Sequence, residues 1–272
     1  MSVITISRGS FSGGKMLAEC LAAKLGYRCV DRDVVVERAA ASSAGVTQQE
    51  IREALTKPPG LLERFNHKRY VYLALIQAAL AEEVQNGKAI YHGLAGHLLL
   101  KAGPHLLRVR IIAPMEFRIV MVRERLKYSR GEAESYIEKV DEERRRWTQY
   151  LYGVDWRDPS LYDLVINLEQ LHIEQACNLV CNLMLERCFE FTGECKREMD
   201  NLVLASQVRA ALALDPATSD LEVEAVASRG TVRISGKLSR VSELDEIKRV
   251  ARAVPGVQSL NLDEMALPAR AL

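Results

Sequence analysis

The sequence predicts an α/β protein: a three-layer domain, with helices on both faces of a parallel sheet, followed by a small α+β domain. Strand-like apolar runs alternate with helical patterns through the first 190 residues, and this alternation is typical of a parallel sheet. A polar stretch at residues 192–200 then precedes a segment with the order α-β-β-α-β. We therefore expect one domain at residues 1–192, a second at residues 198–268, and a linker between them.

The strands and helices of the first domain follow in chain order. Apolar or β-branched runs predict strands at residues 3–7, 26–33, 89–93, 107–112 and 164–167. Helical spacing of apolar residues and charged helix-forming runs predict helices at residues 16–25, 34–41, 70–86, 115–127, 132–147 and 173–189. Thr47, with Glu50 three residues later, predicts the capped start of a further helix at residues 47–55, which the Lys-Pro-Pro-Gly sequence at residues 57–60 ends.

The second domain begins with a predicted helix at residues 202–214. Two strands, joined by a turn at Arg229-Gly230, are predicted at residues 221–227 and 232–236. A helix at residues 242–254 and a strand at residues 257–262 complete the unit.

The loop between the first strand and the first helix carries most of the chemical information. Residues 9–15 read Gly-Ser-Phe-Ser-Gly-Gly-Lys, the pattern G-x-x-x-x-G-K, whose glycines let backbone N–H groups surround a phosphate. The helix N-terminus adds partial positive charge, and Lys15 can reach the outer phosphates. A structural glycine-rich turn is the alternative. We expect a nucleotide-phosphate site formed by Gly9, Ser10, Phe11, Ser12, Gly13, Gly14, Lys15 and Met16.

One part of the usual phosphate-loop pattern is missing. The Ser or Thr that ordinarily follows the lysine and binds Mg²⁺ is replaced by Met16 and then Leu17. The pattern therefore favours ATP as the cofactor more strongly than it favours Mg²⁺, and the metal ligands stay unknown.

Composition excludes several classes of partner. The net charge of +1, with 27% charged residues, gives no general attraction to nucleic acid or membranes. The opening residues lack the pattern of a signal peptide, and no apolar run approaches the ~18 residues of a membrane helix. We expect a soluble, cytoplasmic protein that binds a nucleotide and no nucleic acid.

Several segments of the first domain, in this order, resemble a known family. They are the phosphate loop, residues 25–33, residues 111–118 with Pro114, and the sequences Asp-Glu-Glu-Arg at 141–144, Asp-Trp-Arg-Asp-Pro at 155–159 and Tyr-Asp-Leu at 162–164. Together they resemble the cytidylate kinase-like family of P-loop nucleoside monophosphate kinases. The resemblance implies a P-loop NTPase fold and transfer of the ATP γ-phosphate to a small acceptor.

The resemblance also implies roles for single residues. Lys15, Arg118 and Arg144 are the expected catalytic cations. The expected acceptor-binding residues are Asp31, Arg32, Arg38, Arg157 and Asp163. Two alternatives stay open: the arginines can pair with acids along exposed helix faces, and Asp31 and Asp163 can cap the elements that follow them.

One departure from the family pattern affects the expected activity. Where the family places Gly-Arg after the third strand, this chain has Gly93-Leu94. With Met16 and Leu17, this change supports an alternative function, a catalytically weak or inactive nucleotide sensor that signals through its C-terminal domain.

The C-terminal segment resembles a BON domain. The resemblance rests on Val-Arg-Ala-Ala-Leu at residues 208–212, Gly-Thr-Val-Arg-Ile-Ser-Gly at 230–236 and Val-Pro-Gly-Val at 254–257. It implies association with a protein partner or contact with phospholipid. Acids and bases are nearly balanced here, so any lipid contact is expected to be weak.

Overall fold

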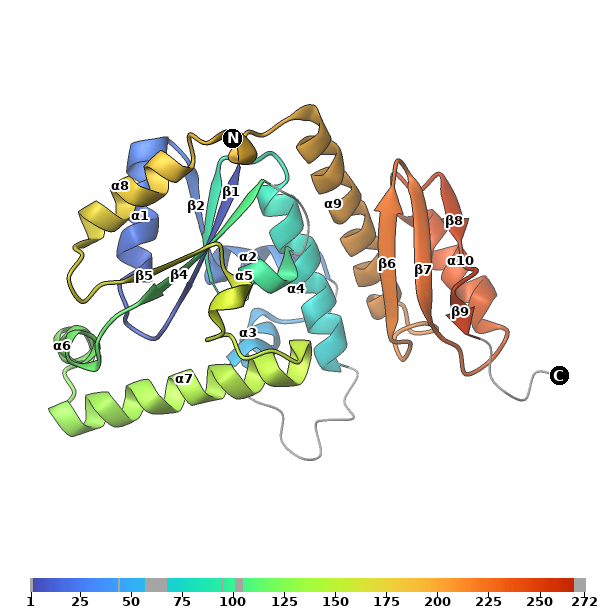
Figure 1. The fold of residues 1–272 in the computed structure, drawn as a ribbon. Helices are drawn as coiled ribbons and strands as arrows, with labels where there is room; N and C mark the ends of the chain where they lie inside the picture. Colours follow the sequence, from blue (N-terminus) through green and yellow to red (C-terminus); the bar gives the residue numbers. More distant parts are fainter. Residues whose placement is uncertain (1, 44, 57–67, 94, 101–104, 267–272) are drawn as a thin grey trace. The chain divides into compact units, whose positions relative to one another are not determined.

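The computed structural model describes residues 2–43, 45–56, 68–93, 95–100 and 105–266 (Figure 1). The chain divides into two units. The first comprises Met1–Val34, Leu55–Pro59 and Gly87–Phe191. The second comprises Val35–Ala54, Gly60–Asn86 and Thr192–Leu272.

A five-stranded parallel sheet forms the centre of the first unit. Its strand order is β2-β3-β1-β4-β5. Side chains alternate between the faces, so Leu107 and Val109 enter the apolar core while Arg108 and Arg110 point to the opposite face. The strands are β1 (Val3–Arg8), β2 (Arg28–Asp31), β3 (Ala89–His92), β4 (Leu106–Ile112) and β5 (Leu164–Asn167).

Helices cover both faces of this sheet, as the sequence predicts. Figure 1 shows α1 (Gly14–Leu25) and α8 (Ile173–Leu183) side by side on one face. Leu17 and Leu21 of α1 are fully buried in the core there, and each contributes roughly 1.5–3 kcal/mol of hydrophobic stabilisation. On the other face lies the short helix α5 (Gly96–Leu99), whose Gly96 is so close to Tyr91 that a Cβ would come within 2.3 Å of its ring.

Two further helices of this unit form a hairpin. Helix α6 (Met115–Leu126) precedes α7 (Arg130–Tyr152), and Ser129 and Glu132 form a capping box at the start of α7. Short 3₁₀ turns follow at Pro159–Leu161 and Arg187–Phe189. The hairpin has its own buried cluster, formed by Ile119, Val122, Ala133 and Ile137.

The second unit combines helices from the first half of the chain with the C-terminal segment. Helix α2 (Arg32–Ala41) runs from the first unit into the second. The unit also contains α3 (Gln48–Thr56), α4 (Lys68–Val84), α9 (Gly193–Leu214) and α10 (Glu243–Ala253). Its sheet has the order β6-β7-β8, with β9 also paired to β7: β6 (Val223–Ser228), β7 (Thr231–Lys237), β8 (Ser259–Asn261) and β9 (Met265–Ala266).

Most predicted elements are confirmed, but the linker is wrong. Residues 192–200 are not a linker; they begin α9, because the Thr192 hydroxyl caps the Cys195 N–H at 3.3 Å and both Cys195 and Met199 are buried. The Thr47–Glu50 capping box is confirmed, with Glu50 Oε2 2.8 Å from the Thr47 backbone N. Helix α5 and strand β9 were not predicted from the sequence.

Some sequence predictions concern residues or boundaries that the structure does not test. The turn at residues 57–60 and the residue Leu94 lie outside the described residues. The domain boundaries at 1–192 and 198–268 stay a prediction, since residues Val35–Ala54 and Gly60–Asn86 group with the C-terminal segment. In the part of the chain that is described, no helix is long and apolar enough to cross a membrane.

Helices α4 and α9 pack against each other inside the second unit, with Tyr70 at the centre of their polar contacts. The Tyr70 hydroxyl donates to the Val223 carbonyl and accepts from Arg209 Nε at 3.2 Å. The Arg209 guanidinium also lies 4.8 Å from the centre of the Tyr70 ring and donates to Gln77 at 3.0 Å. One tyrosine therefore joins α4, α9 and the first strand of the C-terminal sheet.

We predict that Tyr70→Phe lowers the free energy of unfolding by about 1–3 kcal/mol, because it leaves partly buried hydrogen-bonding groups without a partner. Urea denaturation measures this change. Tyr128→Phe is the matched control, since Tyr128 is 39% exposed and its ring, rather than its hydroxyl, makes the contact with Tyr136. Equal stability of the two variants would show that α4 and α9 do not depend on this contact.

Candidate functional site

A cleft of about 620 Å³ lies at the carboxyl ends of β1, β2 and β3 in the first unit. Ligands of open parallel sheets bind at this edge. The phosphate loop, the start of α2, the end of β3 and the α6–α7 hairpin supply its walls. The sequence-predicted residues that line it are Ser10, Phe11, Gly13, Gly14, Lys15, Met16, Asp31, Arg32 and Arg144.

The phosphate loop presents backbone donors to this cleft. Gly13 precedes α1 with a positive φ of 81°, and no side chain among the described residues caps the helix. The first N–H groups of α1 are therefore available to an anion. Lys15 is 57% exposed by its side chain, and its Nζ lies 3.6 Å from Glu19. Such a surface pair is weak and can be exchanged for a phosphate.

The Arg118 side chain contacts the main chain of the phosphate loop. Its Nε donates to the Ser10 carbonyl at 2.7 Å, and its Nη2 donates to Asp141 at 2.6 Å. The other carboxylate oxygen of Asp141 accepts from the Ser10 N–H and from the Ser10 hydroxyl, each at 2.9 Å. Arg118 and Asp141 thus connect α6 and α7 to the loop, and Arg118 is not among the residues that line the cleft.

Arg144 of α7 is partly buried where β1 meets the phosphate loop. It donates to the Arg8 carbonyl, and its guanidinium lies 5.1 Å from the centre of the Trp156 ring. Burial lowers the pKa of Arg144 to about 10, with Arg8 adding repulsion and Asp141 opposing the shift. Arg144 therefore stays cationic at pH 7 and reaches the cleft.

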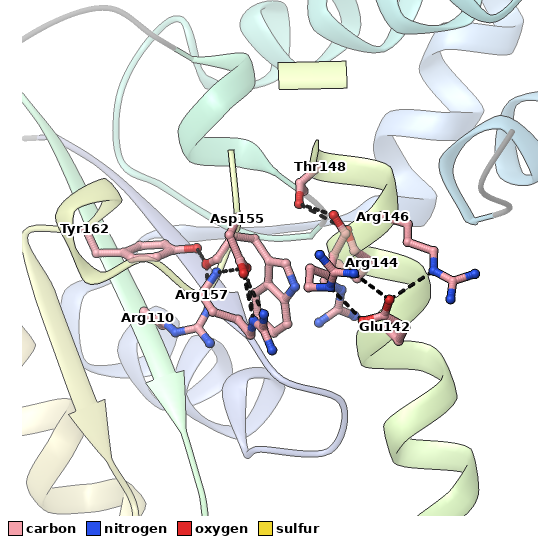
Figure 2. A network of polar contacts seen from close by, with 10 residues as sticks. Arg110, Glu142, Arg144, Arg146, Thr148, Asp155, Arg157 and Tyr162 are labelled. Carbon is pink, nitrogen blue, oxygen red and sulfur yellow. Dashed lines mark hydrogen bonds and ion pairs between the residues drawn. The ribbon is translucent and has the colours of Figure 1, made fainter. Parts of the chain in front are cut away.

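Arg110 is a further cation that sequence reasoning missed. Its side chain leaves β4 on the face opposite the apolar core, and the residue is 7% exposed. The guanidinium donates to the Trp156 carbonyl at 2.7 Å and lies 4.2 Å from the Trp156 ring centre. Figure 2 shows Arg110 and Tyr162 beside the segment 155–157. The signal was a pair of alternating arginines, Arg108 and Arg110, inside an otherwise apolar strand.

The family model for the cytidylate kinase-like family matches residues 3–170, and a BON domain model matches residues 200–265. The first match covers more than half of the chain. The chain belongs to the cytidylate kinase-like family. Its C-terminal segment contains a BON domain, as the sequence predicts.

Two relatives agree with this assignment, and a solved structure shares the fold. The cytidylate kinase of Ignicoccus hospitalis is 28% identical over 192 residues, 68% of this chain and 100% of that protein. The cytidylate kinase of Staphylothermus marinus is 27% identical over 66% of this chain and 94% of that protein. An uncharacterized protein from Eubacterium ventriosum shares the fold, with a TM-score of 0.53 at 16% identity over 69% of this chain and all of that one.

Three predicted acceptor residues of this cytidylate kinase-like protein do not line the cleft. Arg157 pairs with Asp155 at 2.6 Å (Figure 2). Asp163 pairs with Arg108 at 2.6 Å, at the amino end of β5. Arg38 belongs to the second unit, where it forms ion pairs with two glutamates, Glu82 at 2.9 Å and Glu83 at 2.8 Å.

Asp31 and Arg32 do line the cleft. Asp31 also caps α2, because its Oδ1 accepts from the backbone N–H groups of Asp33 at 2.8 Å and Val34 at 3.0 Å. The capping interpretation of Asp31 is therefore confirmed, and its acceptor-binding role stays a prediction. The remaining loop residues, Gly9 and Ser12, do not line the cleft, and Ser12 is buried.

The usual Mg²⁺ ligand of a phosphate loop is missing from this cytidylate kinase-like protein, because Met16 and Leu17 carry no hydroxyl. The cleft lining does include four acidic residues, Glu19, Asp31, Asp33 and Glu143. Among the described residues, no three His, Cys, Asp or Glu side chains form a metal cluster. Proteins often hold Mg²⁺ by one or two carboxylates together with substrate phosphates, and the carboxylate of Glu143 lies in the cleft wall.

His97 is a titratable group buried beside the cleft. It is 7% exposed, and its ring centre lies 4.7 Å from that of Tyr162. Burial, with added repulsion from Arg108 and Arg110, lowers the pKa of His97 from 6.5 to about 4. The folded protein therefore keeps this imidazole neutral at a pH where the unfolded chain protonates it.

We predict that stability falls as the pH drops below about 6.5, because the unfolded state then binds a proton that the folded state does not. The His97 contribution to the free energy of unfolding should fall by about 2 kcal/mol between pH 6.5 and pH 5. Urea denaturation at both pH values measures it. His97→Gln should flatten the pH dependence, and the exposed His172→Gln should not. An equal pH dependence in wild type and His97→Gln would contradict the burial argument.

Proposed function

We propose that this protein is a P-loop kinase of the nucleoside monophosphate type, which transfers the γ-phosphate of ATP to a small phosphorylated acceptor. The observation that carries the proposal is the uncapped start of α1 in a cleft lined by arginine and lysine side chains. Family membership and the cytidylate kinase names of the relatives support CMP as the first acceptor to test.

The charges of the cleft suit phosphoryl transfer. In this reaction an acceptor oxygen bonds to the γ-phosphorus, the bond between the β- and γ-phosphates breaks, and ADP leaves. The protein contributes positioning and positive charge. The N–H groups of α1 and Lys15 would hold the donor phosphates. Arg144 would add a positive charge held in place by its contacts with the Arg8 carbonyl and Trp156.

The α6–α7 hairpin would exclude water from the reaction. Arg118 and Asp141 attach it to the phosphate loop, so its position depends on the conformation of that loop. A lid that closes over the phosphates protects ATP from hydrolysis. ATP itself supplies the transferred group. Any Mg²⁺ would be held largely by the phosphates, together with a carboxylate of the cleft wall such as Glu143.

A nucleotide sensor is the second candidate function. Two observations favour it: the missing hydroxyl at Met16, and the contacts that join α4 to α9 of the BON segment within one unit. In this account the protein binds nucleotide, transfers phosphate slowly or not at all, and signals to a protein partner through the BON domain.

Nucleoside monophosphates incubated one at a time with Mg·ATP, with products separated by chromatography, decide between the two functions. The kinase proposal expects ADP and a nucleoside diphosphate in equal amounts with at least one acceptor. Binding of ATP by calorimetry without any product would favour the sensor. A protein that binds no ATP would contradict both.

We predict that Lys15→Ala weakens ATP binding by about 1.5–3 kcal/mol, since it removes a charge-assisted contact. This corresponds to roughly 10–150-fold in the dissociation constant measured by calorimetry. Lys24→Ala is the matched control, because Lys24 lies at the other end of α1, near Glu174 and Asn178. Unchanged affinity in a folded Lys15→Ala protein would exclude the phosphate-loop interpretation.

A further inference from the structure

Two polar side chains of the cleft have no role in the site described so far. Arg8 is the last residue of β1 and His92 is the last residue of β3. These strands are parallel neighbours, so both residues lie at the carboxyl edge of the sheet, and both line the cleft.

Arg8 is a cation without an ion-pair partner among the described residues. Its side chain crosses Gly14, where a Cβ would come within 2.3 Å of Arg8 Cδ, so a larger residue at that position would displace the Arg8 side chain. The nearby carboxylate of Asp31 is already engaged in capping α2. Burial lowers the pKa of Arg8, and Arg32 adds repulsion. A guanidinium in such surroundings is stabilised by an added anion.

His92 has a buried ring nitrogen, Nδ1, that is unpaired within the described part of the chain. The residue is 6% exposed, and its Nδ1 has no hydrogen-bond partner among the described residues. Burial and the charge of Arg8 lower the pKa of His92, so the imidazole is neutral at pH 7. A neutral imidazole can donate one N–H, and a buried polar atom left unpaired is unfavourable. A ligand oxygen would satisfy it.

The neighbours of Arg8 place this pair on one side of the phosphate loop. Arg8 interacts electrostatically with Arg32, Tyr91 and Asp31, which come from α2, β3 and β2, and also with Arg125 of α6. Arg118, also from α6, contacts the main chain of the phosphate loop through its side chain. The cleft beside Gly14 therefore offers a second anion position, adjacent to the start of α1 but on the β2–β3 side.

We propose that Arg8 and His92 form the subsite that binds the phosphate of the acceptor, a nucleoside monophosphate, next to the phosphate loop. The inference rests on the proposed kinase function. Arg8 supplies the positive charge and His92 an N–H hydrogen bond. Together they would bring the acceptor phosphate oxygen toward the γ-phosphorus and reduce the repulsion between the two phosphate groups.

Calorimetry with two probes, CMP and ATP, tests the assignment. Arg8→Gln should weaken CMP binding at least tenfold and change ATP affinity less than threefold, whereas Lys15→Ala should do the reverse. His92→Phe should weaken CMP binding, and His92→Asn, which keeps a polar group near the position of Nδ1, should retain more affinity. Arg187→Gln is the control for net charge, because Arg187 is an exposed cation of the same unit that does not line the cleft, and it should change CMP affinity less than threefold.

Stability measured without ligand distinguishes a binding role of Arg8 from a structural role. Arg8→Gln removes an unpaired charge, so its urea midpoint without ligand should equal or exceed that of wild type. A lower midpoint, or an equal loss of ATP and CMP affinity, would overturn the proposal. So would failure of wild type to bind CMP, UMP, AMP or orthophosphate while it still binds ATP. Failure to bind ATP as well would instead contradict the proposed function.

Discussion

The balance of charge at the phosphate loop constrains much of the first unit. Arg8, Arg110 and Arg118 all repel the buried guanidinium of Arg144, and Asp141 is the carboxylate that opposes them. Like charges gathered in a region of low dielectric require compensation. Asp141 meets part of this need, and the same carboxylate holds the Ser10 amide and hydroxyl. Asp141 therefore both fixes the conformation of the loop and offsets part of the charge of the nearby arginines.

Aromatic rings and main-chain carbonyls supply further compensation. Trp156 has Arg110 at 4.2 Å and Arg144 at 5.1 Å from its ring centre, so one indole contacts two cations. The carbonyls of Arg8, Ser10 and Trp156 accept from Arg144, Arg118 and Arg110. Cation–π contacts and carbonyls orient guanidinium groups without cancelling their charge. These contacts therefore hold the guanidinium groups near the phosphate loop in fixed orientations.

Local patterns explain what could be predicted from the sequence. The five strands, the helix after Lys15 and the Thr47–Glu50 cap depend on residues close together in the chain, and the structure contains them. The start of α9 was missed because polar residues surround the buried Cys195 and Met199. The contact of Ser10 with Asp141, 131 residues away, depends on tertiary packing that no local pattern encodes. The contact of Arg118, an expected catalytic cation, with the Ser10 carbonyl depends on tertiary packing in the same way, and the sequence did not predict it.

The central claim is that the clustered arginines and the uncapped start of α1 form a site for a polyphosphate anion. Urea denaturation with and without inorganic tripolyphosphate, at constant ionic strength, tests it most directly. The account predicts that tripolyphosphate raises the free energy of unfolding, by about 2.7 kcal/mol at a hundred times the dissociation constant, and that chloride at equal ionic strength does not. An unfolding midpoint that does not change with tripolyphosphate would contradict it.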